Sequence, residues 1–192
     1  MKIIRLMGGL GNQMFQYAFR QVMKADVAYD ISWFDQIKGA LGVTQRSYEL
    51  DFFKCTPWLL SQDELTMIIE SGRQLGEEYA YKLVKEQPFN IYNPELLKVD
   101  NALFVGYFQC YQYYDSIRNQ LLTDFTPVPP INPQNQKILD IIQNTNSVSL
   151  HVRMGDYVKL QHIHGLCSLE YYQKAVDFII ENFPPPLFSV LG

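Results

Sequence analysis

The start of the chain constrains the fold most, because a strand, a glycine-rich turn and a helix follow one another there without a gap. Lys2–Met7 is a short apolar run of the kind that lies inside a buried parallel sheet. The turn at 8–12, with the letters GGLGN, follows directly. Apolar side chains then recur at helical spacing on one face, namely Phe15, Ala18, Phe19 and Val22. This order of elements predicts an α/β domain.

Further strands and helices are predicted along the chain. Ala28–Ile31 has the pattern of a second parallel strand with Asp30 at its carboxyl end, and Ala102–Tyr107 that of another strand. Ser61 has the features of a helix N-cap, with acidic residues in the turn that follows it. Helical spacing in Tyr113–Phe125 predicts one more helix in this part of the chain.

Four prolines within residues 127–133 mark the clearest boundary, since they exclude a regular helix and favour an extended connector. Beyond it we expect a helix from Pro133, a strand over Asn146–Val152, a helix capped by Ser168, and a strand over Leu187–Leu191. We predict two domains, 1–145 and 146–192. The second buries too little apolar area to fold alone, so either it extends the sheet of the first domain or the chain is a fragment.

Composition narrows the class of protein. Of the 192 residues 47% are hydrophobic, which excludes a disordered chain. The net charge is −4 without a basic block, so we expect no nucleic-acid partner. Cys55, Cys110 and Cys167 lie far apart and form no zinc motif, so we expect reduced thiols. Without a signal peptide or a membrane-spanning segment, we predict a cytoplasmic protein, and attachment to a membrane surface stays open.

The glycine-rich turn is the first candidate site, with Gly8, Gly9, Gly11 and Asn12 as its binding residues. Glycines let the backbone approach a ligand closely, and the N-terminus of the following helix favours negative charge. The spacing matches neither the GxGxxG fingerprint nor a P-loop. Asn12 and Gln13 can hydrogen-bond a sugar or a phosphate. A structural strand-to-helix turn with Asn12 as the cap explains the pattern equally well.

The second candidate site follows the strand at 146–152. Arg153 lies at the carboxyl end of that strand, where ligands bind in parallel sheets. Its guanidinium suits a diphosphate and can neutralise the charge on a departing phosphate. Asp156 can orient Arg153 or bind a hydroxyl, and His151 is either a ligand contact or a buried structural histidine. The alternative is a surface Arg–Asp pair worth ~0–1 kcal/mol.

A third group contains His162, His164 and Glu170, any of which can act as the general base for a sugar hydroxyl. A solvated loop is the simpler interpretation of these residues. The aromatic segment Tyr107–Tyr114 can stack on sugar rings, although tyrosines at this spacing are more typical of a half-buried core.

Two motifs together carry a resemblance to a known family. The letters GGLGNQMFQYA at 8–18, followed by HVRMGDY at 151–157, resemble the α-1,2-fucosyltransferases of glycosyltransferase family 11. The segments GYFQ at 106–109 and YYQKA at 171–175 are similar to that family in the same order. The resemblance covers essentially the whole chain.

The resemblance implies a GT-B enzyme with two Rossmann-like domains, the first on the acceptor side and the second binding GDP-fucose. It implies inverting transfer of fucose from GDP-fucose to the 2-hydroxyl of a terminal galactose in a glycan, without a metal or other cofactor. Arg153 and Asp156 would be catalytic, with Arg153 also binding the GDP diphosphate. Gly8, Gly9, Gly11, Asn12 and His151 would line the substrate site.

Two features differ from the family pattern. Met154 stands where the family usually has a second arginine. Family members also continue beyond the strand at 187–191, so we expect 146–192 to be the first part of the donor domain and the isolated chain to be inactive. The alternatives are a fucosyltransferase of another linkage and a non-catalytic sugar-binding remnant.

Overall fold

The computed structural model describes residues 1–23, 26–42, 44–76, 80–128, 131–152 and 165–191. The chain divides into two compact units, Met1–Pro129 and Pro130–Gly192. The division falls inside the proline-rich segment that the sequence indicates as a boundary. The predicted division of function after residue 145 stays a prediction.

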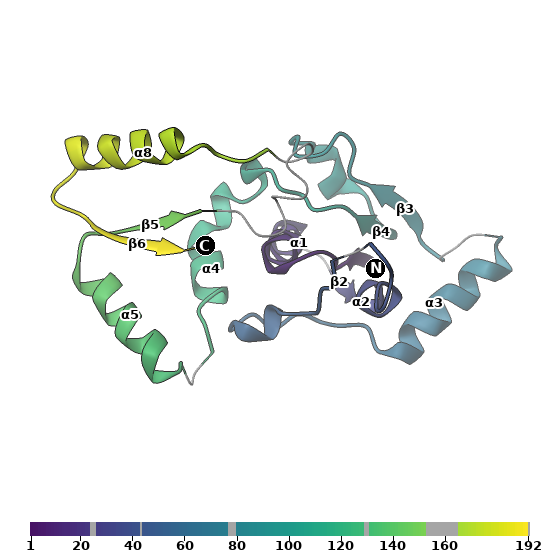
Figure 1. The fold of residues 1–192 in the computed structure, drawn as a ribbon. Coiled ribbons are helices and arrows are strands. Elements are labelled where there is room, and N and C mark those ends of the chain that lie inside the picture. The colour runs from purple at the N-terminus through teal and green to yellow at the C-terminus, as the bar shows by residue number, and fades with distance from the viewer. Residues whose placement is uncertain (24–25, 43, 77–79, 129–130, 153–164, 192) are drawn as a thin grey trace. The chain divides into compact units, whose positions relative to one another are not determined.

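The first unit is built on a four-stranded parallel sheet with the strand order β2-β1-β4-β3 (Figure 1). Its strands are β1 (Lys2–Arg5), β2 (Val27–Asp30), β3 (Lys82–Lys85) and β4 (Ala102–Val105). Ile3 pairs with Ala28 on one side and with Leu103 on the other. The strands predicted near residues 2–7, 28–31 and 102–107 are confirmed, and the sequence pattern did not indicate β3.

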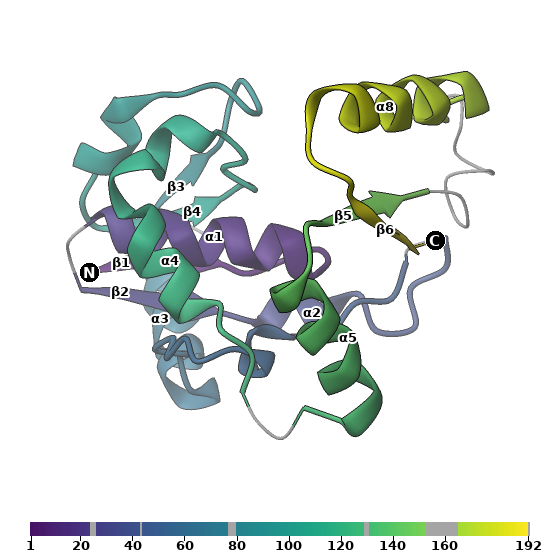
Figure 2. The same ribbon diagram turned by 90° about the vertical axis from the view of Figure 1, so that its left-hand side faces the viewer.

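Helices cover both faces of this sheet, because alternate strand residues point to opposite sides. One face packs against α1 (Leu10–Met23) in a cluster that includes Ile4, Phe19, Tyr29 and Phe104. The other face packs against α3 (Gln62–Gln74) in a cluster that includes Ile3, Ala28, Leu65, Ile68 and Leu103. Figure 2 shows α1 and α3 on opposite sides of the strands β1 and β2.

Short elements connect these layers: α2 (Ser32–Gln36), α4 (Arg118–Asp124) and 3-10 turns at Leu50–Phe52, Pro94–Lys98, Tyr111–Tyr113 and Asp115–Ile117. The helix predicted over Tyr113–Phe125 therefore begins only at Arg118. Tyr114 explains the difference, because its hydroxyl donates to the backbone carbonyls of Phe15 and Phe108. This anchoring holds the preceding residues in tight turns.

The second unit contains α5 (Pro133–Asn144), β5 (Ser147–His151), α8 (Leu169–Asn182) and β6 (Leu187–Leu191). The two strands are parallel, and Ser147 pairs with Leu187. The side chain of Asn132 caps α5 by accepting from the Asn135 N–H at 2.8 Å, and that of Ser168 caps α8 by accepting from the Tyr171 N–H at 3.2 Å. The predicted elements of this region are confirmed.

Both units are thus α/β structures with parallel strands, as predicted from the sequence. Within the described part of the chain, no helix combines the length and the hydropathy needed to cross a membrane.

Candidate functional site

The strands of the first unit are parallel, so their carboxyl ends lie at one edge of the sheet, where a ligand is expected. From β1 the chain continues to β2 on one side, whereas β4 and β3 lie on the other side. In parallel α/β sheets, ligands bind beyond the carboxyl ends of the strands. The glycine-rich turn follows β1, and the segment 106–109 follows β4. Both sequence segments therefore leave the sheet at the same carboxyl edge.

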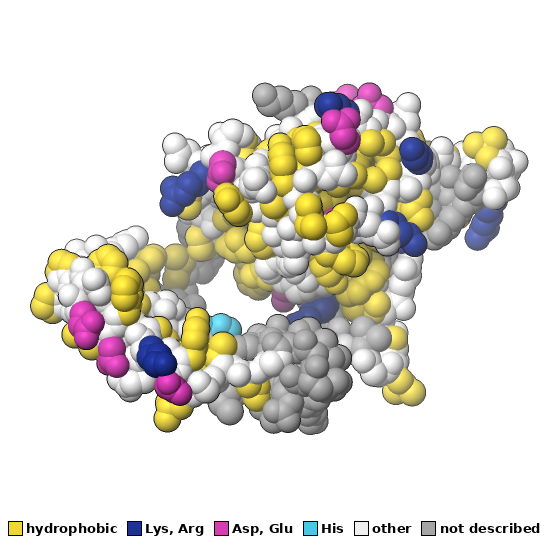
Figure 3. Space-filling view, turned by 90° about the horizontal axis from the view of Figure 1, so that it is seen from above, with side chains coloured by type: hydrophobic (Ala, Val, Ile, Leu, Met, Phe, Trp, Pro, Cys, Tyr) yellow, Lys and Arg dark blue, Asp and Glu magenta, His cyan; other side chains and the backbone are white. Residues whose placement is uncertain are grey.

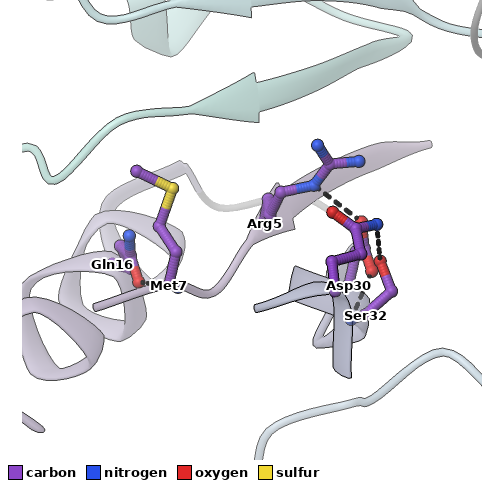
Figure 4. A network of polar contacts seen from close by, with 6 residues as sticks. Arg5, Met7, Gln16, Asp30 and Ser32 are labelled. Atoms are coloured by element: carbon purple, nitrogen blue, oxygen red, sulfur yellow. Dashed lines mark hydrogen bonds and ion pairs between the residues drawn. The ribbon is translucent and has the colours of Figure 1, made fainter. Parts of the chain in front are cut away.

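Side-chain amides join these two segments. The Gln109 side-chain amide donates to Asn12 Oδ1 at 2.7 Å. The fully buried Gln16 donates from Nε2 to the Gly106 carbonyl at 2.8 Å. Its Oε1 accepts from the Met7 N–H at 3.0 Å (Figure 4). Residues about 90 positions apart in the sequence thus form one rigid rim above β1 and β4.

The three glycines of the turn have different structural roles. Gly8 has a φ of +80°, and a Cβ there would collide with the Asn12 side-chain amide, so only glycine fits. A Cβ on Gly11 would meet no described atom within 4 Å. Asn12 lies inside α1, which begins at Leu10, so the interpretation of Asn12 as the helix cap is wrong. Packing therefore explains Gly8, and it does not explain Gly11.

Glu86 holds the other half of the rim and was not indicated by any sequence motif. Its buried carboxylate follows β3 and accepts from the N–H groups of Tyr107 and Phe108, both at 2.8 Å. A Cβ on Gly106 would collide with the Glu86 side chain, so glycine is required for this close approach. The sequence offered no signal for it, because the pattern did not indicate the strand β3 that Glu86 follows.

Gln13 connects the glycine-rich turn to the segment 45–49. Its side chain is completely buried and donates to the carbonyls of Gly8 at 3.1 Å and Ser47 at 2.8 Å. Its oxygen accepts from the Glu49 N–H at 2.9 Å. The nitrogen and the oxygen of this side-chain amide are both bonded to backbone groups. Gln13 therefore positions a loop and is not itself a ligand contact.

A cleft of about 540 Å³ lies where segment 45–49 faces α2. Aromatic and charged side chains line it, including Phe34, Asp35, Lys38, Arg46, Tyr48 and Glu49. Arg46 also borders the glycine-rich turn, because a Cβ on Gly9 would lie 3.7 Å from its guanidinium carbon. The cleft therefore adjoins the rim at the carboxyl edge of the sheet.

A buried ion pair supports the wall formed by α2. Arg5 of β1 donates from Nε to Asp30 Oδ2 at 3.0 Å, and the Asp30 side chain is completely buried (Figure 4). The other oxygen of Asp30 accepts from the Ser32 N–H at 2.8 Å, at the start of α2. The carboxyl end of β2 thus fixes the helix that borders the cleft.

The hydroxyl of Tyr48 and the thiol of Cys55 stay protonated near neutral pH. Burial raises the pKa of Tyr48 to about 12, and burial likewise raises the pKa of Cys55 to about 11. Tyr48 can therefore donate a hydrogen bond inside the cleft, and Cys55 is no nucleophile. The expectation of free thiols is confirmed, although Cys167 is exposed while Cys55 and Cys110 are buried.

The second predicted site falls largely outside the described residues. Arg153, Met154, Asp156, His162 and His164 all belong to the segment 153–164, so their predicted roles stay predictions. His151 ends β5 and is exposed, so the alternative of a buried structural histidine is wrong.

Other candidates have structural explanations. Glu170 forms an exposed ion pair with Lys174 at 2.7 Å, which agrees with a solvated position. In the aromatic segment 107–114, Phe108 stacks on Phe19 with the ring centres 3.9 Å apart, and Tyr113 and Tyr114 are buried. The core interpretation of that segment is confirmed for these three residues. The residues that the structure describes contain no group of three or more His, Cys, Asp or Glu able to hold a metal ion.

Comparison with known proteins gives three relatives. An α-1,2-colitosyltransferase of Escherichia coli is 29% identical over 210 residues, which cover 99% of this chain and 68% of that protein. The O-antigen biosynthesis glycosyltransferase WbnK of Escherichia coli is 29% identical over 209 residues, covering 91% of this chain and 66% of WbnK. Galactoside α-(1,2)-fucosyltransferase 2 of the gorilla is 30% identical over 95 residues, covering 45% of this chain and 28% of that protein.

The chain spans about two thirds of the length of the two bacterial relatives. No family model matches it, and no solved structure matches it. All three relatives are glycosyltransferases, and two of them carry α-1,2 linkage in their names. The resemblance to α-1,2-fucosyltransferases and the assignment as a glycosyltransferase are therefore confirmed.

Proposed function

We propose that this chain, a relative of α-1,2-fucosyl- and α-1,2-colitosyltransferases, works in the inverting transfer of fucose from GDP-fucose to the 2-hydroxyl of a terminal galactose. The observation that carries the proposal is the rim at the carboxyl edge of the sheet. There the segments 8–16 and 106–109, which the resemblance identified from sequence, are joined through Asn12–Gln109 and Gln16–Gly106. Ligands of parallel sheets bind at this edge.

The reaction is a single displacement at the anomeric carbon. The galactose 2-hydroxyl oxygen forms the new bond to that carbon while the bond to the diphosphate oxygen breaks, and GDP leaves with both electrons. The hydroxyl proton passes to a general base. In this proposal Arg153 stabilises the charge on the departing diphosphate, and Asp156 orients Arg153.

We propose further that the enzyme has the GT-B architecture and needs no metal, with Arg153 as the cation that meets the diphosphate. Support for this part comes from the parallel strands of both units and from β5, which ends at His151 just before Arg153. A cytoplasmic location completes the proposal, and the three free thiols are consistent with a reducing compartment.

The test is a transfer assay with the protein expressed from its intact gene, next to the 192-residue chain. We expect transfer from GDP-fucose to methyl β-D-galactopyranoside and none to its 2-deoxy analogue, which lacks the attacking oxygen. Product on the 2-deoxy analogue would mean another linkage. Galactoside binding without turnover by the intact gene product would mean a sugar-binding remnant.

One relative is a colitosyltransferase, so the assay includes nucleotide-activated colitose as a second donor. Preference for that donor would correct the sugar in our proposal and leave the linkage unchanged. Arg153→Ala should reduce turnover by about a hundredfold or more. Arg118→Ala on the exposed surface of α4 is the matched control and should leave turnover unchanged.

A further inference from the structure

The cleft between α2 and segment 45–49 has the features of a built binding site. Its two walls are attached to the sheet by buried polar groups: Asp30 holds the start of α2, and Gln13 holds the backbone of Ser47 and Glu49. Both side chains are almost completely buried. The backbone of both walls is therefore held by the core of the unit, while exposed side chains such as Lys38 and Arg46 complete the lining.

The charges that line the cleft balance one another. Asp35 and Glu49 are acidic, and Lys38 and Arg46 are basic. Among the residues that the structure describes, no ion pair joins any two of these four groups. A diphosphate would need a surplus of positive charge, which this lining lacks. A neutral ligand with many hydroxyls can use donors and acceptors of both signs.

Two half-buried aromatic residues complete the lining. Phe34 and Tyr48 offer ring surface, and the Tyr48 hydroxyl offers a donor at neutral pH. Apolar surface together with a few convergent polar groups is typical of small-molecule sites. Aromatic surface suits the apolar C–H face of a pyranose, while the charged groups suit its hydroxyls.

We infer that this cleft binds the acceptor saccharide, and that Arg46 and Glu49 select it by hydrogen bonds to its hydroxyls. The inference rests on the proposed transferase function and adds the acceptor subsite to it. Arg46 lies against Gly9 of the glycine-rich turn, so a sugar held by Arg46 also borders the rim at the carboxyl edge of the sheet. The cleft thus presents a neutral sugar to the edge where transfer is proposed.

The experiment measures galactoside binding without a donor, by saturation-transfer NMR with methyl β-D-galactopyranoside on the 192-residue chain. Arg46→Ala and Glu49→Gln should each weaken binding about tenfold, the effect of losing a charge-assisted hydrogen bond. Glu49→Gln keeps the backbone bond to Gln13. Arg73→Ala and Glu70→Gln, both exposed on α3, are the matched controls and should bind as the unmodified chain does.

A second measurement separates this inference from the proposed function. In an active enzyme the two cleft variants should raise KM for the galactoside about tenfold and leave KM for GDP-fucose unchanged. If the unmodified chain binds the galactoside and both cleft variants lose this binding, the result supports the subsite even when no fucose is transferred. Transfer with an unchanged galactoside KM overturns the subsite and leaves the transferase standing. Displacement of the galactoside by GDP also overturns it, because the cleft would then be a donor site.

Discussion

In the first unit, four parallel strands carry helices on both faces, and side chains such as Ile4, Phe19 and Phe104 are fully buried. In the second unit, two parallel strands lie with α5 and α8, and none of the side chains described there is buried. The elements are of the same kind, and both units contain helices that are capped by a side chain. The comparison shows that local signals suffice to form strands and helices, whereas a core needs a sheet wide enough to cover each helix.

Helix α8 illustrates the difference. Tyr172, Val176 and Ile179 are half-buried, whereas Phe178 and Ile180 are more than half exposed. Figure 3 shows hydrophobic side chains on the surface, interspersed with acidic ones. An exposed apolar stripe of this size is an aggregation hazard until something covers it.

The largest effect on the free energy of unfolding is expected from one of a matched pair of Phe→Ala substitutions, which test this comparison. Phe19→Ala removes a buried ring that stacks on Phe108, and it should lower the free energy of unfolding by about 3–5 kcal/mol. Phe178→Ala removes a ring that is 58% exposed and should change it by less than about 0.5 kcal/mol. Urea unfolding followed by circular dichroism measures both. Equal effects would show that the second unit is packed as tightly as the first.

A smaller effect is expected in alkaline solution, because the buried tyrosines belong to the first unit. Burial raises the pKa of Tyr29 and Tyr114. Burial also raises the pKa of Tyr17, and the negative charge of the nearby Asp124 carboxylate raises it further. The unfolded chain releases these protons near pH 10, while the folded chain keeps them. The free energy of unfolding should therefore be constant below about pH 9 and fall as the pH rises from 10 to 12.

The measurement is a series of urea unfolding curves between pH 8 and 12, with tyrosine absorbance at 295 nm as the probe of ionisation. Tyr48→Phe is the control. Because burial raises the pKa of Tyr48 to about 12, removing this hydroxyl should make the decrease in the free energy of unfolding with pH less steep. A free energy of unfolding that stays constant up to pH 12 would contradict the burial of these rings.

The smallest expected effect is the loss of a serine N-cap, which can be compared between one helix of each unit. Ser61 caps α3 in a capping box, where its hydroxyl accepts from the Glu64 N–H and the Glu64 carboxylate accepts from the Ser61 N–H. Ser168 caps α8 with a single bond. Each Ser→Ala substitution should cost about 1 kcal/mol.

Amide hydrogen exchange shows where that cost appears. Loss of the Ser61 cap should lower protection throughout the first unit, because α3 covers one face of its core. Loss of the Ser168 cap should lower protection only within α8. Reduced protection in both units after Ser168→Ala would mean that α8 unfolds together with the first unit.

Much of the fold could be predicted because its signals are local. The caps at Ser61 and Ser168, the proline-rich connector and the apolar runs of β1, β2 and β4 all lie within a few residues of the elements they define. Strand β3 carries lysine at both ends and is largely exposed, so it lacks the continuous apolar run of a buried strand.

The candidate site was harder to predict, because its key contacts link distant residues. In the sequence Gln13 has the features of a ligand contact, whereas in the structure it holds backbone groups of another segment, as Gln16 also does. Arg46 and Glu49 carry no motif of their own. Their importance follows from the bonds of Gln13 to residues more than 30 positions away, and no local pattern records these.

The position of β1 inside the sheet also has a consequence for synthesis on the ribosome. Ile3 pairs with Ala28 soon after it emerges, but its partner on the other side, Leu103, is made 100 residues after it. At a synthesis rate of ~5–20 residues per second, the second edge of β1 stays unpaired for ~5–20 s. The nascent chain therefore carries an open, apolar strand edge for that time, and it is then most vulnerable to pairing with a neighbouring chain.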